Sequence, residues 1–174
     1  RDLTSAVSKH ESETSGADAQ INWLANLWNA ISVGTEARKD HVKSTDSGDH
    51  DTRLLAGYLQ DEVSIGEPLI LVLGGRYDSH SVYGGQFSPK ASARYLIAST
   101  GTIVRASAGK SYRAPTLNDL YWSDPFMPGN PNLRPETAKE YEVGVEQKVG
   151  KEGVVKLTGF ERQVKDLINW HPDA

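Results

Sequence analysis

The chain has 174 residues, of which 37% are hydrophobic and 24% charged, with a net charge of −4 and no cysteine. The lack of cysteine excludes disulfides, thiolate metal sites and cysteine nucleophiles, and the dispersed Lys and Arg argue against a nucleic-acid partner. No run of about 18 consecutive apolar residues is present, so the sequence predicts no transmembrane helix. Membrane-spanning strands are shorter and only half apolar, so a membrane protein is not excluded.

Alternation of apolar and polar residues with a period of two recurs along the chain, and no helix-length amphipathic segment interrupts it. The clearest predicted strands cover residues 17–27, 31–38, 54–65, 69–78, 90–95, 102–110, 140–149 and 154–163, with weaker ones at 1–8 and 166–170. We therefore expect about nine or ten strands.

The predicted connections alternate in length. Long ones are expected at 9–16, 40–52, 79–86 and 111–136, and short ones at 28–29, 64–68, 98–101 and 149–153. In an up-and-down antiparallel sheet successive connections lie at opposite ends, so the long loops share one end. A Greek-key sandwich is not expected to alternate so regularly. The pattern predicts an all-β antiparallel meander with loops 40–52 and 111–136 at the same end.

Each predicted strand has one apolar and one charged face. The apolar face is expected to carry Trp23 and Tyr95 near one end and Tyr77 and Tyr141 near the other, as in the aromatic girdles of a membrane barrel. The charged face is expected to hold Glu36, Arg38, Arg76, Asp78, Lys90, Arg94, Arg105, Glu140, Glu142 and Glu146. So many charges do not suit a dry core. The solvated outer face of a soluble sheet would explain the charges alone equally well.

The predicted loop 111–136 combines aromatic residues, an arginine and five prolines, a composition that suits a recognition surface. Tyr121 and Trp122 are the candidate ligand-binding residues, because they lie between two blocks of structural character. The residues expected to fix the entry to the next strand are Arg113, Pro115, Asn130, Pro131, Pro135 and Glu136.

Other site chemistry is sparse. Asp46, Asp49 and Asp51 carry oxygen ligands that suit a hard cation, but they lack the EF-hand pattern, and a solvated acidic loop is the favoured interpretation. The five histidines are scattered, without metal-ligand spacing or a nucleophile motif. We expect no catalytic residue, no metal site, no cofactor and no enzymatic activity.

Three blocks resemble the barrel of TonB-dependent outer-membrane transporters: SYRAPTL (111–117), GNPNLRPE (129–136) and YEVGVE (141–146). Further similarity covers ISVGTEARKD (31–40), LGGRYDS (73–79) and FERQVKDLINW (160–170). Within that family the chain is most similar to the transporters of cobalamin, a corrinoid.

The resemblance implies part of a barrel of about 22 strands in the outer membrane of a Gram-negative bacterium. The N-terminal plug, which contacts TonB, and the remaining strands would be absent from this chain, and loops 40–52, 79–86 and 111–136 would be extracellular. The implied function is active uptake of a scarce nutrient, cobalamin or an iron-siderophore. The implied partners are that small molecule, TonB through the plug, and outer-membrane lipid.

The alternative is a soluble β-sandwich that serves as a ligand-binding or adhesin module. It requires a second sheet of the same chain over the apolar face. A hydrolase is discounted, because no nucleophile motif is present.

Overall fold

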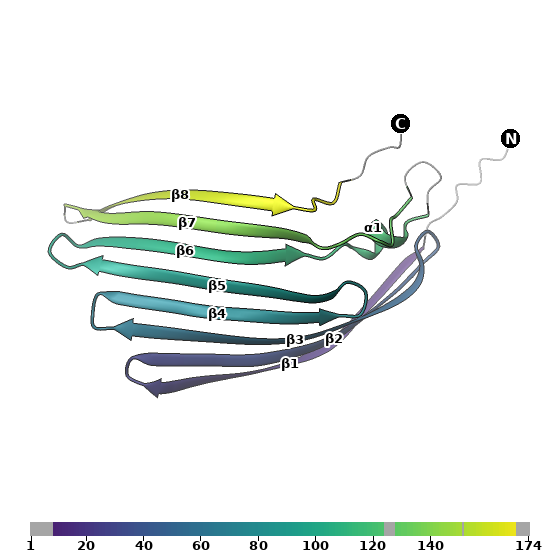
Figure 1. Ribbon diagram of the computed structural model, residues 1–174, viewed down its shortest axis with the longest axis horizontal. Helices are drawn as coiled ribbons and strands as arrows, with labels where there is room; N and C mark the ends of the chain where they lie inside the picture. Colours follow the sequence, from purple (N-terminus) through teal and green to yellow (C-terminus); the bar gives the residue numbers. More distant parts are fainter. Residues whose placement is uncertain (1–8, 124–127, 151, 170–174) are drawn as a thin grey trace.

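The computed structural model describes residues 9–123, 128–150 and 152–169. These residues form one antiparallel sheet of eight strands in sequence order, seen side by side in Figure 1. The strands are β1 (His10–Asn26), β2 (Asn29–Ser44), β3 (Gly48–Ile65), β4 (Leu69–His80), β5 (Gly84–Ile97), β6 (Thr102–Arg113), β7 (Glu136–Val149) and β8 (Gly153–Lys165), with helix α1 (Leu117–Tyr121) between β6 and β7. The predicted all-β antiparallel meander is confirmed.

Several segments expected to be loops are strands. The predicted loop 9–16 belongs to β1, and the predicted loop 40–52 is shortened to the turn 45–47 between β2 and β3. The loop predicted at 79–86 is likewise only the turn 81–83. Eight strands rather than nine or ten cover the described residues. The strand expected at 1–8 lies outside them, and residues 166–169 are not a strand.

These errors have a common physical cause, which is that strand pairing continues beyond the apolar band. Glu13 pairs with His41, and His41 pairs with Asp51, in an unbroken ladder. Where both faces of a strand meet water, no apolar alternation marks it as a strand. Among the described connections only 114–135 is long, so the regular alternation of loop lengths was wrong although the topology inferred from it is right.

Cross-strand partners in an antiparallel ladder share a face of the sheet. One row of partners runs through Trp23, Ile31, Asp61, Leu73, Ala91, Ala108 and Tyr141. Tyr77 and Tyr95 lie an even number of residues from this row and so fall on the same face, while Arg76, Arg94, Arg105 and Glu142 fall on the other. The predicted division into two faces is confirmed. Asp61 is a polar exception on the apolar face, where its Oδ1 accepts a hydrogen bond of 2.7 Å from Asn29 Nδ2.

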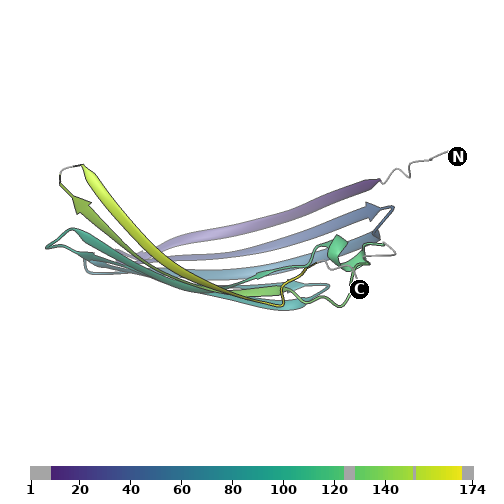
Figure 2. The same ribbon diagram turned by 90° about the horizontal axis from the view of Figure 1, so that it is seen from above.

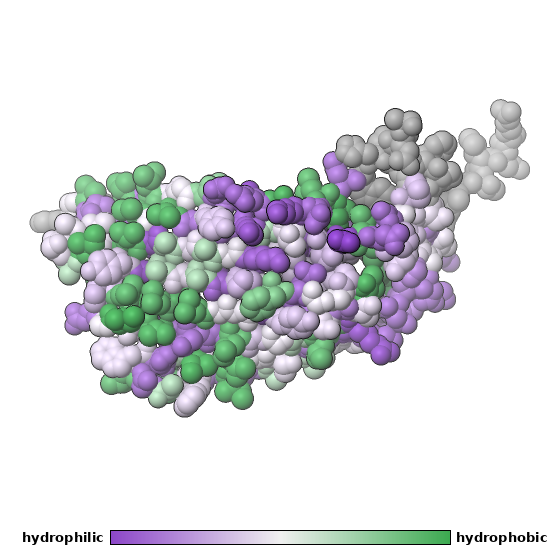
Figure 3. All heavy atoms as spheres, viewed as in Figure 1, coloured by the Kyte–Doolittle hydropathy of each residue, from purple (hydrophilic) through white to green (hydrophobic). Residues whose placement is uncertain are grey.

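The apolar face is exposed. Leu59, Leu73 and Val143 on this face are 55%, 56% and 59% accessible to solvent. Apolar side chains gather over the half of the sheet farther from α1, and hydrophilic ones dominate toward α1 (Figure 3). No second sheet covers either face among the described residues, so the sandwich architecture is not what they form.

The sheet curves into a trough, with α1 on its concave side (Figure 2). The buried hydrophobic residues are few: Val42, Leu54, Ala56, Leu120 and Ala138. Val42, Leu54 and Ala56 share the charged face through the β2–β3 register. The small core therefore lies on the charged, concave face, toward the α1 end. Within the described ranges no helix is long and apolar enough to span a membrane.

Candidate functional site

Helix α1 begins at a capping box. The backbone N–H of Asp119 donates to Thr116 Oγ1 at 3.1 Å, and the N–H of Thr116 donates to Asp119 Oδ2 at 2.8 Å. This reciprocal arrangement satisfies two backbone donors that the helix itself leaves unpaired. Asp119 and Leu120, both within α1, are buried. The short helix therefore has a fixed start and a fixed inward side.

Helix α1 lies against the β2–β3 turn (Figure 1). Ser47 Oγ donates to Asn118 Oδ1 at 3.0 Å, across 71 residues of sequence. The N–H of Ser123 donates to the carbonyl oxygen of Asp46 at 2.8 Å. The ring of Tyr121 stacks on that of His50, with centroids 3.8 Å apart and planes 10° from parallel. The segment after β6 is thus joined to a hairpin formed much earlier in the chain.

The two candidate ligand-binding residues stand together at this end of the sheet. Tyr121 is the last residue of α1, and Trp122 follows it as the C-cap. The Trp122 N–H donates to the carbonyl of Asn118 at 3.0 Å, and its carbonyl accepts from the Gly129 N–H at 2.8 Å. Both side chains are half-buried. They border a hollow of 490 Å³, lined by Leu120, Tyr121, Trp122, Ser123, Pro128, Gly129 and Pro131.

A charged cluster lies on the concave face near α1. Arg76 Nη2 bridges Glu36 Oε2 at 2.7 Å and Asp78 Oδ1 at 2.8 Å, and Asp78 is only 2% exposed. These residues border a second hollow of 380 Å³, which Tyr83 and Tyr112 also line. With its carboxylates already paired to arginine, this hollow offers hydrogen-bonding groups without a large net charge.

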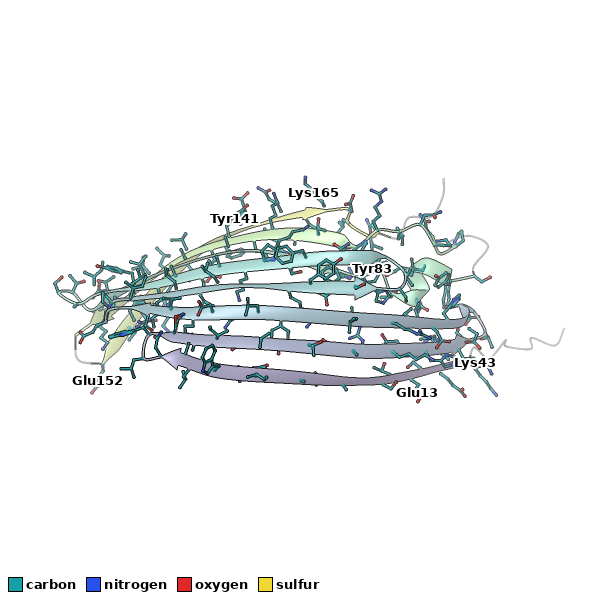
Figure 4. The ribbon with its side chains drawn as sticks, turned by 60° about the horizontal axis from the view of Figure 1, so that its bottom comes forward. Glu13, Lys43, Tyr83, Tyr141, Glu152 and Lys165 are labelled. Atoms are coloured by element: carbon teal, nitrogen blue, oxygen red, sulfur yellow. The ribbon has the colours of Figure 1, made fainter. Side chains whose placement is uncertain are left out.

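An aromatic group borders the second hollow. Tyr83, in the β4–β5 turn at the α1 end of the sheet (Figure 4), stacks on His80 with ring centroids 3.9 Å apart. The Tyr112 ring lies 6.1 Å from that of Tyr83. Burial raises the pKa of the Tyr83 phenol and lowers the pKa of His80. Both groups are therefore neutral hydrogen-bonding groups at neutral pH, which suits binding of a polar ligand.

The sequence assigned no role to His50 or Tyr83. The segment Asp46-Ser47-Gly48 does contain a turn signal, and Gly48 has a φ of 81°, a conformation that favours glycine. This turn signal is enough to predict a hairpin turn at residues 46–48. Nothing local indicates that Ser47 meets Asn118, because the contact depends on the curvature of the whole sheet.

Three of the residues expected to be structural, Arg113, Asn130 and Glu136, make local hydrogen bonds or ion pairs. Glu136 Oε1 accepts from Arg113 Nη1 at 3.3 Å and from the Ile168 N–H at 2.8 Å. Glu136 is buried. It links the start of β7, where it lies, to the segment that follows β8. Asn130 Oδ1 accepts from the Asn132 N–H at 2.9 Å, which closes the turn before β7.

Two of the three acidic residues considered for a cation, Asp49 and Asp51, form pairs with basic side chains. Asp51 Oδ1 lies 2.9 Å from Lys39 Nζ and 3.4 Å from His41 Nδ1, and Asp49 lies 3.6 Å from the same histidine. The hydrogen bond from Lys39 holds the pKa of Asp51 below its usual value. Within the described residues, no group of three or more His, Asp or Glu side chains is arranged to hold a metal ion.

Residues 5–174 match the family described as "TonB dependent receptor-like, beta-barrel". The chain belongs to this TonB-dependent receptor family. The match covers nearly the whole sequence and agrees with the meander, its exposed apolar face and its charged concave face. The family resemblance stated from the three sequence blocks is therefore confirmed.

Two curated relatives match parts of the chain. The chain is 37% identical over 99 residues to a vitamin B12 transporter of Photobacterium profundum, an alignment that covers 56% of the chain and 15% of that protein. It is 28% identical over 150 residues to an iron-regulated outer membrane virulence protein of Vibrio cholerae, covering 79% of the chain and 23% of that protein.

A solved structure shows the same fold. The siderophore receptor PirA of Pseudomonas aeruginosa superposes with a TM-score of 0.79 at 24% identity, covering 95% of this chain and 34% of that one. The chain thus spans between 15% and 34% of the length of these three proteins. It corresponds to part of such a barrel.

Proposed function

We propose that the chain forms part of the wall of a nutrient transporter in the outer membrane of a Gram-negative bacterium. Its apolar face contacts lipid, and its charged concave face lines the lumen. The observation that carries this proposal is that four exposed aromatic residues, Trp23, Tyr77, Tyr95 and Tyr141, share one apolar face, where a barrel-like strand tilt would set them at two levels. Aromatic girdles at the two interfaces bound the apolar band of outer-membrane barrels.

The two levels follow from the register and a barrel-like strand tilt. Trp23 and Tyr141 lie on one row, six strands apart. With strands about 4.8 Å apart and tilted by about 40°, each step along the row adds about 3 Å of depth, or about 18 Å in all. Leu73 lies three strands from Trp23 along the row, and Tyr77 lies four residues beyond Leu73. Together these steps put Tyr77 about 19 Å in depth from Trp23. The same reasoning puts Tyr95 within about 2 Å of the level of Trp23.

The rest of the barrel completes this wall in the proposal. β1 and β8 are the edges of the described sheet, and their unpaired backbone groups would be costly in lipid. Neighbouring strands of a barrel of about 22 strands would pair with them. A plug inside the lumen would contact TonB. The turns 45–47 and 81–83 and the connection 114–135 would then face the outside of the cell.

The proposed cargo is a scarce nutrient, either cobalamin or an iron-siderophore complex. A relative named as a vitamin B12 transporter supports the first, and a protein named as a siderophore receptor supports the second. Tyr121 and Trp122 are the proposed ligand contacts, because half-buried aromatic side chains beside a hollow provide contact area at little cost in conformational entropy. We propose no catalytic step for the chain. Its proposed role is to help bind the nutrient and to form part of the wall past which the nutrient moves.

Uptake by whole cells tests this function. The intact protein that contains this chain is expressed in a Gram-negative strain lacking its own cobalamin and siderophore receptors, and uptake of radiolabelled cyanocobalamin and of ferric siderophores is measured. We expect one of the two ligand classes to accumulate, and only where TonB is present. Replacing Tyr121 and Trp122 together by Ala should weaken binding about tenfold or more.

The matched control is Trp28→Ala, which removes an exposed aromatic residue from the turn at the opposite end of the sheet. It should leave binding unchanged. Failure to bind either ligand class, or uptake that persists without TonB, would contradict the proposed function.

A further inference from the structure

We propose that Ser47 and His50 of the β2–β3 hairpin are positioning residues, which hold Tyr121 and Trp122 in the orientation that binds ligand. The inference rests on the proposed function, because it assigns a role to residues beside the proposed ligand surface. Neither residue needs to touch the ligand. Their effect would be transmitted through α1.

The hairpin is well suited to hold another segment. β2 and β3 remain paired up to Ser44 and Gly48. Within the turn, Ser44 Oγ accepts from the N–H groups of Asp46 and Ser47 at 3.1 and 3.3 Å. His50 Nε2 lies 2.6 Å from the carbonyl oxygen of Ser47. Ser47 is 3% exposed, so its hydroxyl is fixed where it meets α1. A preorganised scaffold of this kind fixes the residues that it contacts.

The contacts reach α1 along one side. Asn118 and Tyr121 are three residues apart and therefore lie on the same face of the helix. Asn118 receives the Ser47 hydrogen bond, and Tyr121 receives the His50 stack. Ser123 extends the same attachment through its backbone bond to Asp46. Three contacts thus flank Trp122 on both sides in sequence, so they set the direction in which the Tyr121–Trp122 pair faces.

This arrangement predicts a specific kinetic outcome in the intact transporter. His50→Ala should raise the half-saturating ligand concentration about 3- to 10-fold, because an aromatic stack is lost, and leave the maximal uptake rate unchanged. His50→Phe keeps a stacking ring but loses the contact with the Ser47 carbonyl oxygen, so its half-saturating concentration should lie between those of wild type and His50→Ala. Ser47→Ala should resemble His50→Ala. The matched control, His41→Ala, removes a histidine of β2 that pairs with Asp49 and Asp51 instead and should have no effect.

A reversible cross-link provides a second test with a readout other than uptake. The chain contains no cysteine, so Ser47→Cys with Asn118→Cys introduces one pair at positions whose side-chain oxygens are 3.0 Å apart. The pair should form a disulfide without ligand, seen as a mobility shift on electrophoresis. In the His50→Ala background, oxidation should restore the half-saturating concentration, and reduction should raise it again.

The outcomes separate this inference from the proposed function. Normal half-saturation in His50→Ala, or a cross-link that abolishes binding, would overturn the positioning role while leaving uptake by the wild type in place. A lower maximal rate with fewer binding sites would show that His50 serves folding only. A wild type that takes up neither ligand class would instead contradict the proposed function, and the cross-link would still report whether α1 occupies this position.

Discussion

Replacing Ala106 by Arg is expected to destabilise the intact barrel by about 2–4 kcal/mol, because the charge would face lipid near the middle of the apolar band. Ala106 lies on the apolar face, with Ala93 and Val143 as its cross-strand partners. With strands tilted by about 40°, Ala106 lies about 10 Å in depth from Trp23, midway between the two levels of aromatic residues. Urea unfolding of the full-length protein in lipid vesicles measures the change in the free energy of unfolding.

Ser107→Arg is the matched control, one residue further along β6. Ser107 pairs with Ser92 and Glu142 on the charged face, so the new guanidinium would meet water and a carboxylate. We expect a change within about 1 kcal/mol, since an exposed ion pair contributes little. Equal destabilisation by the two arginines, or a larger effect at Ser107, would contradict the assignment of the apolar face to lipid.

Gly129→Ala is expected to displace α1 and weaken ligand binding about tenfold or more. A Cβ atom at Gly129 would lie 2.6 Å from Trp122 N, 2.7 Å from Tyr121 N and 2.8 Å from the Leu120 carbonyl carbon. These are backbone atoms, so no side-chain rotation relieves the overlap, and the helix and the Gly129 segment must separate. Ligand titration of cells that carry the intact variant measures the loss of affinity.

Gly159→Ala controls for the general effect of adding a methyl group. A Cβ at Gly159, in β8, would have no atom within 4 Å, so binding and the amount of assembled protein should match the wild type. Unchanged affinity in Gly129→Ala would mean that the position of Tyr121 and Trp122 does not matter for the ligand, which would remove the support for both as contact residues.

The division of the sheet into two faces could be predicted from sequence because it depends only on parity along each strand. Where one face is apolar, as at Val104, Ala106 and Ala108, the period of two is visible and the register follows. Where both faces meet water, as at residues 10–16 of β1, strand and loop have the same composition. The hydrogen-bonded ladder then continues without a sequence signal, which is why the lengths of β1, β2 and β3 were underestimated.

The candidate site was only half accessible from sequence. Tyr121 and Trp122 were proposed as ligand contacts because they lie between two motif blocks within a long connection, and that role stays a prediction. His50, Ser47 and Tyr83 were not, because they lie in hairpins whose apposition to α1 is set by the curvature of the eight-stranded sheet. A contact between residues 71 apart, such as Ser47 to Asn118, has no local periodicity to indicate it.

The most direct test of the lipid-facing wall is a nitroxide scan along β6. Single cysteines introduced at residues 103–108 of the intact protein in outer-membrane vesicles, with any cysteine outside this chain replaced by serine, would carry the spin label. Collision with dissolved oxygen, which concentrates in lipid, is compared with collision with a water-soluble nickel complex. A lipid-facing apolar side should give a period of two, with oxygen access highest at Val104, Ala106 and Ala108 and nickel access highest at Arg105 and Ser107. Uniform access along the strand, or the opposite phase, would contradict it.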